Sequence, residues 1–269
     1  MKKSPSILIL CRYLSLGIVL CFFLAGCNKK TELYGPDKEI IQDKTKTQII
    51  LIGPPGVGKG TLGAALADYY ELPYISSGQI IRDIKNDPTD RNYHVIVPYL
   101  KSSLLVPDSV VNDLVIDRIK DEDCEDGFIL EGYPRTLTQA VVLDKELKAL
   151  NANQSNIGGA PTVNSKIVVL QISDEKELIN RIKKRAMCAK CNTGVVDVLK
   201  NPGLCKGCRG DEVVRDDDTE DIARKRLKIY AEETKPIISY YGPSRVVIIN
   251  AMQIPSAVFK EVVDKIDAK

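Results

Sequence analysis

The sequence has little net charge, a single histidine, and no internal repeat or low-complexity segment. The formal net charge of +2 over 269 residues gives no reason to expect nucleic acid as an electrostatic partner. The single histidine, His94, has no partner pattern around it and is predicted to be a surface residue. The length allows one α/β domain with insertions or two small domains. These absences leave an ordinary globular protein whose function must be sought in local motifs.

The first 47 residues differ in composition from the rest of the chain. Two lysines precede an apolar stretch, residues 7–24, so residues 1–27 have the pattern of a secretory signal segment. The segment ends in Leu-Ala-Gly-Cys, which resembles the lipobox of bacterial lipoproteins, where the cysteine, here Cys27, is lipidated and becomes the mature N-terminus. Residues 28–47 are polar and charged and are predicted to form a tether.

This beginning predicts a lipid-anchored protein outside the cytoplasm, which meets the membrane only through its N-terminus. An uncleaved transmembrane anchor is one alternative, because the apolar stretch is nearly long enough to span a bilayer. A mis-assigned start codon is another, and it would leave a cytoplasmic protein that begins near Gln48.

The strongest motif follows the apolar run Ile49–Ile52 and reads Gly-Pro-Pro-Gly-Val-Gly-Lys-Gly-Thr from Gly53 to Thr61. Its glycines and lysine have the spacing of a P-loop, although the hydroxyl residue, Thr61, comes one place late. Glycines allow backbone N–H groups to turn toward one anion, and Lys59 adds a positive charge. The helix expected next points its positive end at the same anion. A glycine-rich turn in an unrelated loop is the alternative. The residues predicted to surround the phosphates are Gly56, Val57, Gly58, Lys59, Gly60 and Thr61.

Four of the eight cysteines form a set, because Cys188-x-x-Cys191 and Cys205-x-x-Cys208 are separated by thirteen residues. Two such turns converge on a tetrahedral zinc ion, and four thiolates leave no open position, so the predicted zinc is structural. Two disulfides are the alternative if the domain is exported. A nucleic-acid zinc ribbon is disfavoured because the segment lacks aromatic residues for stacking. Cys124 stands alone and is predicted to be a small buried residue rather than a nucleophile.

A longer, ordered set of motifs resembles the adenylate kinase family. The P-loop is joined by Ile-Ser-Ser-Gly-x-x-x-Arg, which begins at Ile75, and the family's other landmarks follow in order. These are Leu105-Val106-Pro107-Asp108, Gly132-Tyr133-Pro134-Arg135-Thr136 with Gln139, Arg181 and Arg185, the four cysteines, Arg215-Asp216-Asp217-Asp218, and Arg224-Lys225-Arg226-Leu227. The resemblance covers about residues 48–267. It implies a P-loop α/β kinase domain over residues 48–269 with a doubly wound parallel sheet, a helical acceptor-binding insertion (76–106) and a small zinc-ribbon-like lid that closes over ATP (186–216).

The resemblance also implies roles for individual residues. Phosphoryl transfer brings two polyanions together, so positive charge should converge from several segments. The residues implied in catalysis are Lys59, Arg135, Arg181, Arg185, Arg215 and Arg226. Those implied in ATP binding are the P-loop residues named above with Arg181 and Gln253. Those implied in AMP binding are Ser77, Arg82, Leu104, Leu105, Val106, Gly132, Tyr133, Pro134, Arg135, Gln139, Arg215 and Arg226.

Local expectations accompany these roles. Glu131 ends a predicted buried strand, where the acid that helps to hold hydrated Mg²⁺ belongs, although the family usually has Asp. A rim charge or helix cap is the alternative for this residue. Arg181 and Arg185 are four residues apart, which predicts one helix face. The run 216–218 is predicted to be a solvated helix start, and the bond before Pro134 is a candidate cis peptide.

These expectations predict a monomeric kinase that transfers the γ-phosphoryl group of MgATP to AMP and forms two ADP. A CMP or UMP kinase is the alternative enzyme, although Ser77 and Gln139 retain groups able to contact the adenine or ribose of AMP. A membrane-tethered nucleotide-binding protein without useful turnover is the alternative from another class, suggested by the lipobox and by the scarcity of ATP outside a cytoplasm. The retained lysine and arginines argue against it.

Overall fold

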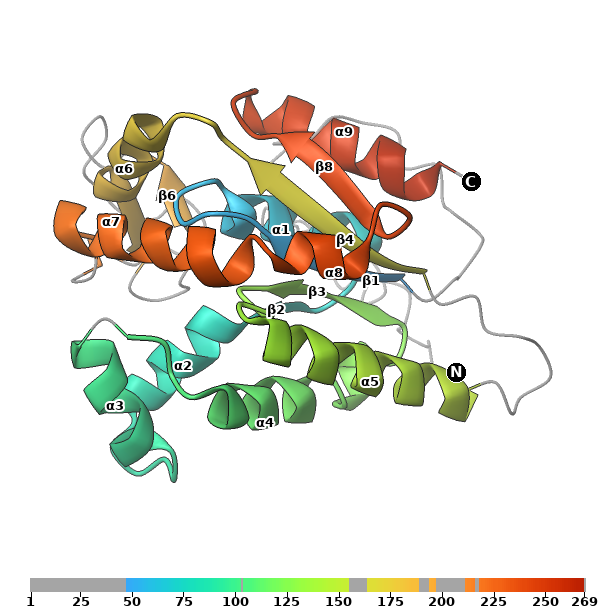
Figure 1. Cartoon of the computed structure of the whole chain (residues 1–269), viewed down its shortest axis with the longest axis horizontal. Coiled ribbons are helices and arrows are strands. Elements are labelled where there is room, and N and C mark those ends of the chain that lie inside the picture. Colours follow the sequence, from blue (N-terminus) through green and yellow to red (C-terminus); the bar gives the residue numbers. More distant parts are fainter. Residues whose placement is uncertain are drawn as a thin grey trace, which may run out of the picture. The chain divides into compact units, whose positions relative to one another are not determined.

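Figure 1 shows a computed structural model of the protein, which describes residues 47–102, 104–154, 164–188, 194–196, 211–215 and 218–268. The predicted signal segment, the lipidation site at Cys27 and nearly all of the predicted tether lie outside these ranges. Within them, no helix is both long and apolar enough to cross a bilayer.

Parallel strands form the central sheet, in the order β2-β3-β1-β4-β8. In the central strand, Ile50 lies opposite Leu130 and Ile167 of its two neighbours, and all three side chains are fully buried. Strands that are apolar on both faces require helices on both sides of the sheet. The predicted α/β fold with a parallel sheet is confirmed. Its strands are β1 (Thr47–Ile52), β2 (Tyr74–Ser76), β3 (Gly127–Glu131), β4 (Asn164–Gln171) and β8 (Val246–Asn250).

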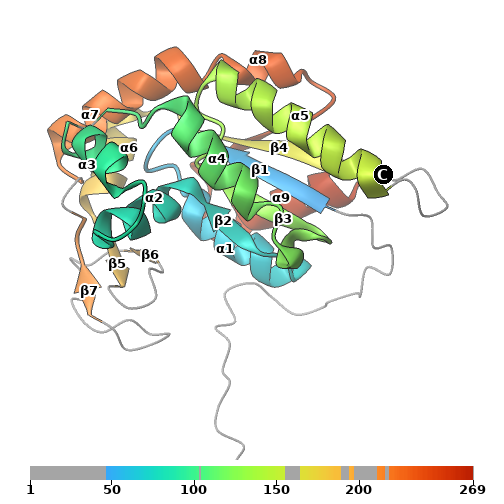
Figure 2. The ribbon, with the colours of Figure 1, turned by 90° about the horizontal axis from the view of Figure 1, so that it is seen from below.

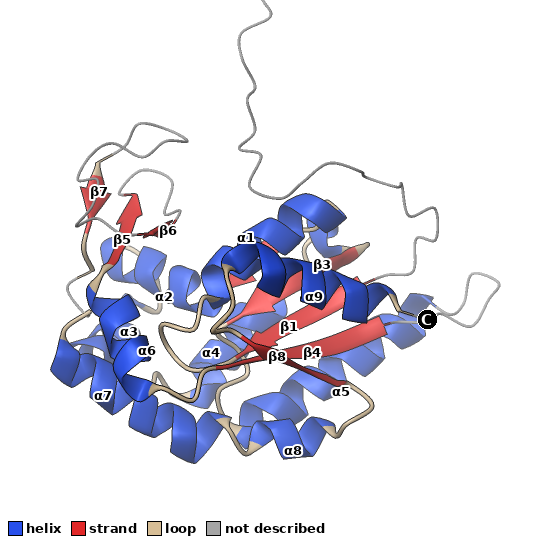
Figure 3. Ribbon diagram, turned by 90° about the horizontal axis from the view of Figure 1, so that it is seen from above, coloured by secondary structure: helices blue, strands red, loops and turns tan. Residues whose placement is uncertain are grey.

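Helices cover both faces of this sheet, as Figures 2 and 3 show from opposite sides. The covering helices are α1 (Lys59–Tyr70) and α9 (Pro255–Asp267) on one face, and α4 (Asp108–Arg118), α5 (Leu137–Gln154) and α8 (Ile237–Tyr241) on the other. The core between the sheet and α4, α5 and α8 includes Val115, Leu143 and Ile237.

Two additions interrupt the fold where the sequence predicted an acceptor-binding insertion and a lid. The first contains the helices α2 (Ser77–Asn86) and α3 (Tyr93–Lys101). The second contains a small antiparallel sheet, β6-β5-β7, made of β5 (Arg185–Cys188), β6 (Gly194–Val196) and β7 (Glu212–Val213). His94, on α3, is exposed as predicted.

The helix before the lid ends earlier than predicted. α6 (Glu175–Lys183) is capped by Asp174, but it ends before Arg185, which is the first residue of β5. The prediction that Arg181 and Arg185 share one helix face was therefore wrong. The physical reason is the run Ala186–Cys188, whose buried side chains and antiparallel pairing favour a strand.

After the lid the chain forms α7 (Glu220–Ile229), a π-helical turn η2 (Tyr230–Thr234), and α8. In the π-turn the N–H of Lys235 donates to the carbonyl oxygen of Tyr230 at 2.8 Å, one residue further back than in an α-helix. A short turn, η1 (Glu122–Cys124), precedes β3. The loops after β1 and β3 leave the sheet at the carboxyl ends of the strands, where open α/β sheets bind their ligands.

Candidate active site

The P-loop connects β1 to α1 and has the backbone geometry of an anion cradle. Gly56 and Gly58 have φ values of 82° and 104°, which favour glycine. A Cβ at Gly56 would also lie 2.7 Å from the carbonyl oxygen of Leu178 on α6. Glycine is therefore required at this position both by conformation and by the close approach of α6.

The ammonium group of Lys59 is held against the loop. Nζ donates to the carbonyl oxygens of Gly53 at 2.7 Å and Pro54 at 2.9 Å. Burial lowers the pKa of Lys59 to about 8, although the negative charge of Glu131 opposes this shift. A phosphate in the loop would replace carbonyl contacts with an anion and favour the charged lysine.

Glu131 ends β3 beside the P-loop, as predicted. Its Oε2 accepts hydrogen bonds from Ser76 Oγ at 2.7 Å and from Tyr74 OH at 3.5 Å. Burial acts to raise the pKa of Glu131, but Lys59, the Ser76 hydrogen bond and the nearby arginines lower it below its usual value. The carboxylate is therefore ionised at neutral pH, which is the state that a hydrated Mg²⁺ ion requires of a ligand or of a hydrogen-bond acceptor for its water.

Arginines from several segments gather next to Glu131. Burial lowers the pKa of Arg226 on α7 to about 10, and the positive charges of Arg185, Arg135, Arg215 and Arg82 lower it further in that order. These residues come from β5, from the loop after β3, from the end of the lid and from α2. Like charges this close repel one another, so the site is suited to a polyanion that would compensate them.

One acid inside the cluster corrects a prediction. The side chain of Asp218 is fully buried, and its carboxylate accepts from Arg185 Nε at 2.8 Å and contacts Arg185 Nη2. It also lies 3.6 Å from Arg226 Nη1. The prediction that 216–218 is a solvated run was therefore wrong for Asp218, because its carboxylate is buried against Arg185 and Arg226. Residues 216 and 217 lie outside the described ranges.

The predicted acceptor residues divide into exposed, lining and supporting positions. Ser77 is buried, and its hydroxyl has no hydrogen-bond partner in the described part of the chain. Arg82 Nη2 donates to Gln79 Oε1 at 2.8 Å, so a neutral amide orients this arginine. Leu104 is exposed, Leu105 is partly buried, and Val106 belongs to the core.

The loop after β3 holds Arg135 through its backbone. The peptide bond between Tyr133 and Pro134 is cis, as the sequence suggested, and Gly132 has a φ of 81°. The N–H of Arg135 donates to Gln139 Oε1 at 2.7 Å, and its Nε donates to the carbonyl oxygen of Gly132 at 2.7 Å. The buried Gln139 side chain is thus a support for Arg135 in this structure.

Tyr133 has a similar supporting place. Its ring is buried in the core, and its hydroxyl donates to Asn112 Oδ1 at 2.7 Å. The structure therefore brings Tyr133 to the base of the loop, and its hydroxyl is already bonded to a residue of α4.

Two predicted ATP-binding residues meet at a different loop, after β8. Arg181 on α6 donates through Nη1 to the carbonyl oxygen of Ala251 at 3.1 Å and through Nε to Glu177 at 2.7 Å. Gln253 is exposed, and its Nε2 donates to Glu261 Oε2 at 2.7 Å. The contact with Ala251 places Arg181 at the loop that carries Gln253.

Only one of the predicted zinc ligands lies in a described segment. Cys188 is buried at the end of β5, whereas Cys191, Cys205 and Cys208 lie outside the described ranges. No group of three or more metal-binding side chains occurs among the residues that the structure describes.

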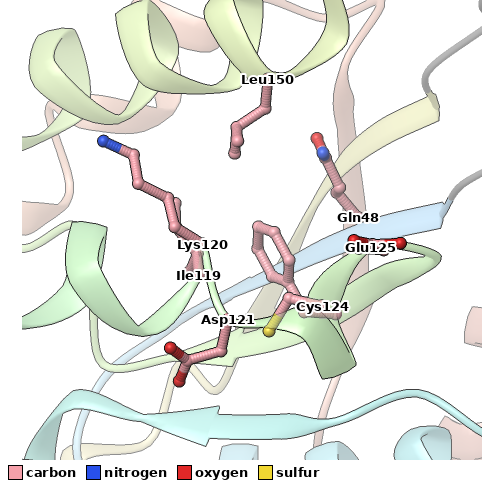
Figure 4. A pocket seen from close by; sticks show the side chains of 8 residues that line it. Gln48, Ile119, Lys120, Asp121, Cys124, Glu125 and Leu150 are labelled. Atoms are coloured by element: carbon pink, nitrogen blue, oxygen red, sulfur yellow. The ribbon is translucent and has the colours of Figure 1, made fainter. Parts of the chain in front are cut away.

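Cys124 lies in a separate place, at the edge of a small cavity of about 50 Å³ that Figure 4 shows. The cavity is also lined by Gln48 and Phe128, which are near the amino ends of β1 and β3, opposite to the P-loop. Burial raises the pKa of Cys124 to about 11, so the thiol is protonated at neutral pH. The burial of Cys124, with 7% of its surface exposed, confirms the prediction of a small buried residue.

Comparison with known proteins decides the family. The family model for adenylate kinase matches residues 51–246. Adenylate kinase from Alkaliphilus oremlandii is 37% identical over 221 residues, which cover 80% of this chain and 96% of that protein. Adenylate kinase from Fervidobacterium nodosum is 40% identical over 199 residues, with 72% and 84% covered, and that from Caldicellulosiruptor bescii is 34% identical over 205 residues, with 75% and 90% covered.

The chain belongs to the adenylate kinase family. It is therefore an enzyme of the nucleoside monophosphate kinase type. The adenylate kinase match runs from the end of β1 to the start of β8, so it includes the P-loop, both additions and the arginine cluster, but not Gln253.

The motifs did not reveal the residues that hold the arginines of this adenylate kinase site in place. Asp218 was recognised as acidic but not as the counter-charge of Arg185 and Arg226. Its position between two predicted phosphate arginines, one on each side in the sequence, was the available signal. Thr234, whose hydroxyl donates to the carbonyl oxygen of Arg135 at 2.9 Å, belongs to no motif and could be found only from the fold.

Proposed function

We propose that this adenylate kinase transfers the γ-phosphoryl group of ATP to AMP and forms two ADP. The convergence of Arg82, Arg135, Arg185, Arg215 and Arg226 beside the P-loop is the observation that carries the proposal. A single nucleoside triphosphate needs fewer cationic partners than these arginines and Lys59, whereas two nucleotides placed end to end bring enough phosphate charge to compensate the whole cluster.

The P-loop holds the donor in this proposal. Its backbone N–H groups and the N-terminus of α1 face the phosphates, and Lys59 moves from the carbonyl oxygens of Gly53 and Pro54 to a phosphate oxygen. Arg181 and Gln253 contact the nucleoside end of ATP at the loop after β8. Glu131 would hold hydrated Mg²⁺, which supplies charge neutralisation on the donor phosphates when it is bound.

The acceptor lies on the other side of Glu131. Arg82 and Arg135 hold its phosphate, and Arg185, Arg215 and Arg226 stabilise the charge on the group in transfer. The unpartnered hydroxyl of Ser77 supports a polar contact with the acceptor, because a buried donor gains about 1 to 3 kcal/mol when it is satisfied. The lining segments Leu104–Val106 and Gly132–Gln139 complete this side.

We also propose that Cys188, Cys191, Cys205 and Cys208 hold a structural zinc ion in the lid. Two C-x-x-C turns and the thiolate donor set support this, as does the place of Cys188 at the end of a short strand. Metal analysis of protein purified without added metal, together with a count of free thiols, tests it. One zinc per chain and four more reactive thiols after chelation than before it are expected, and two disulfides without zinc would refute it.

For the N-terminus we propose lipidation at Cys27, so that a monomeric kinase domain is held outside the cytoplasm by residues 28–47. The signal-like composition supports this. Mass spectrometry of the protein extracted from membranes should find a lipid-modified Cys27 at the N-terminus, and Cys27→Ser should lack this modification. A soluble wild type that keeps residues 1–26, seen by mass spectrometry, would instead indicate a cytoplasmic enzyme.

The catalytic proposal is tested by ADP formation from ATP with AMP, CMP or UMP as acceptor, using a soluble form that begins at Asn28. A kcat/KM for AMP far above those for the other two is expected. Preference for CMP or UMP would change the acceptor. No turnover with any of them, from folded protein, would favour a tethered nucleotide-binding protein.

A further inference from the structure

A threonine outside every motif contacts the backbone of an active-site arginine. Thr234 is the last residue of the π-turn η2, and it is buried, with 8% of its surface exposed. Its Oγ1 donates to the carbonyl oxygen of Arg135 at 2.9 Å. The two residues are 99 positions apart, so this bond joins the α7 side of the site to the loop after β3.

This bond completes a backbone clamp on Arg135. The N–H of Arg135 is bound by Gln139 Oε1, and Gln139 is itself fixed because its Nε2 donates to Asp108 Oδ1 at 2.7 Å. Thr136 Oγ1 donates to the other oxygen of Asp108 at 2.7 Å. The amino side of the Arg135 peptide is thus held from α4 and α5, and its carbonyl side is held from η2.

The clamp matters because the arginines repel one another. Arg226 lies on α7, directly before η2, and the charge of Arg135 is among those that destabilise its protonated form. Asp218 compensates Arg185 and Arg226 directly, whereas the hydrogen bonds that Arg135 donates go to the Gly132 carbonyl oxygen and the Gln139 amide, and Glu131 is the negative charge that acts on it. Without a bound phosphate, the position of Arg135 relative to Arg226 therefore depends on its backbone anchors as well as on Glu131.

The π-turn is anchored on its far side. Ile237 and Tyr241 of α8, which follow η2 directly, are buried in the core. A hydroxyl on such a fixed element holds its partner more firmly than one on a loop would. π-turns are uncommon within helices and occur frequently at functional sites.

We propose that Thr234 is a positioning residue, which sets the place of Arg135 relative to Arg226 through its hydrogen bond to the Arg135 carbonyl oxygen. The inference rests on the proposed role of Arg135 in holding the acceptor phosphate. Loss of the hydroxyl leaves a carbonyl group without its partner and frees the arginine loop from η2.

The test compares Thr234→Val, which keeps the shape but lacks the hydroxyl, with Thr234→Ser, which keeps the hydroxyl, in the full-length protein. Thr234→Val is expected to lower kcat/KM for AMP about tenfold, while KM for ATP stays within about twofold of wild type. Thr234→Ser should retain most of the wild-type kcat/KM for AMP. Ser239→Ala, which removes the hydroxyl of an exposed serine on α8, is the control and should behave as wild type. Thr234→Ala replaces the valine variant if the latter does not fold.

A double-mutant cycle with Arg135→Ala separates the possible failures. If Thr234 acts through Arg135, the valine substitution should have little further effect on AMP kinetics in the alanine background. A large effect of Arg135→Ala together with unchanged AMP kinetics in Thr234→Val would overturn this inference alone. Unchanged AMP kinetics in Arg135→Ala would overturn the role of Arg135 itself. A lower melting temperature in Thr234→Val, with both KM values and kcat unchanged below it, would show a structural role only.

Discussion

The donor and acceptor halves of the site are built in different ways. The P-loop takes all its groups from nine consecutive residues, 53–61, and it presents backbone N–H groups and one lysine. The arginine cluster takes its charges from α2, the loop after β3, the lid and α7, and it needs buried supports such as Asp218 and Gln139. A cradle of backbone groups is fixed by local geometry, whereas a cluster of like charges exists only if tertiary packing holds it together.

The largest effect is expected from the locally built half. Lys59→Ala should lower kcat by about 10³-fold or more, because the variant lacks the ammonium group that contacts the transferring phosphate. The fold should persist, since Lys59 bonds only to carbonyl oxygens of its own loop among the described contacts. Steady-state kinetics and circular dichroism measure the two outcomes. Lys225→Ala, an exposed lysine on α7, is the control, and wild-type turnover in Lys59→Ala would contradict the role.

A second substitution sharpens the comparison by removing a support of the assembled half. Asp218→Asn keeps the shape but removes the charge that two arginines share, so kcat should fall about tenfold to hundredfold. The free energy of unfolding should fall by about 2 kcal/mol, less than for a fully buried pair because both arginines are partly exposed.

Thermal denaturation and kinetics check the Asp218 variant beside Asp221→Asn, an exposed acid on α7. Inorganic phosphate should restore more stability to Asp218→Asn than to wild type, because it supplies the missing negative charge. Equal stabilisation of both proteins would show that Asp218 does not compensate the cluster.

The titration of Lys59 distinguishes the halves without mutation. Its pKa of about 8 in the free protein means that the charged form is lost as the pH rises through that value, whereas Arg215 and Arg226, each with a pKa of about 10, stay protonated to higher pH. The kcat/KM for ATP should therefore fall about tenfold per pH unit above pH 8. The value of kcat at saturating MgATP should persist to higher pH, because bound phosphate raises the lysine pKa. A kcat/KM that is flat to pH 10 would contradict this.

The smallest effect is expected at the boundary between the halves. Glu131→Asp shortens the carboxylate by one methylene and restores the residue that the family usually has. The Mg²⁺ concentration for half-maximal rate should change by about threefold at most, with kcat within the same range. Glu131→Gln, which removes the charge, is the comparison and should raise the Mg²⁺ requirement much more. Equal behaviour of the two variants would assign Glu131 a structural role.

The sheet and its ligand edge could be predicted because their causes are local. Short apolar runs rich in β-branched and aromatic residues, such as Ile49–Ile52 and Phe128–Leu130, are typical of buried strands, and a P-loop after the first of them defines the donor half. The cap at Asp174 and the burial of Cys124 also follow from neighbouring residues. These features depend on interactions within a short window of sequence.

The supports could not be predicted because their causes are distant. The burial of Asp218 depends on Arg185, which lies 33 residues away and on a strand rather than on the predicted helix. The bond from Thr234 to Arg135 depends on a π-turn that no motif indicates. An alternation of charges in the sequence does not distinguish a solvated acid from one that is buried between arginines.

The hydroxyl of Ser76 has a consequence of its own. The same oxygen accepts the N–H of Gln79 at 3.4 Å, which caps α2, and donates to Glu131 at 2.7 Å. The first turn of the helix that carries Arg82 and the ionised state of the carboxylate beside the donor thus share one atom. A change at residue 76 cannot alter one nucleotide's surroundings without altering those of the other.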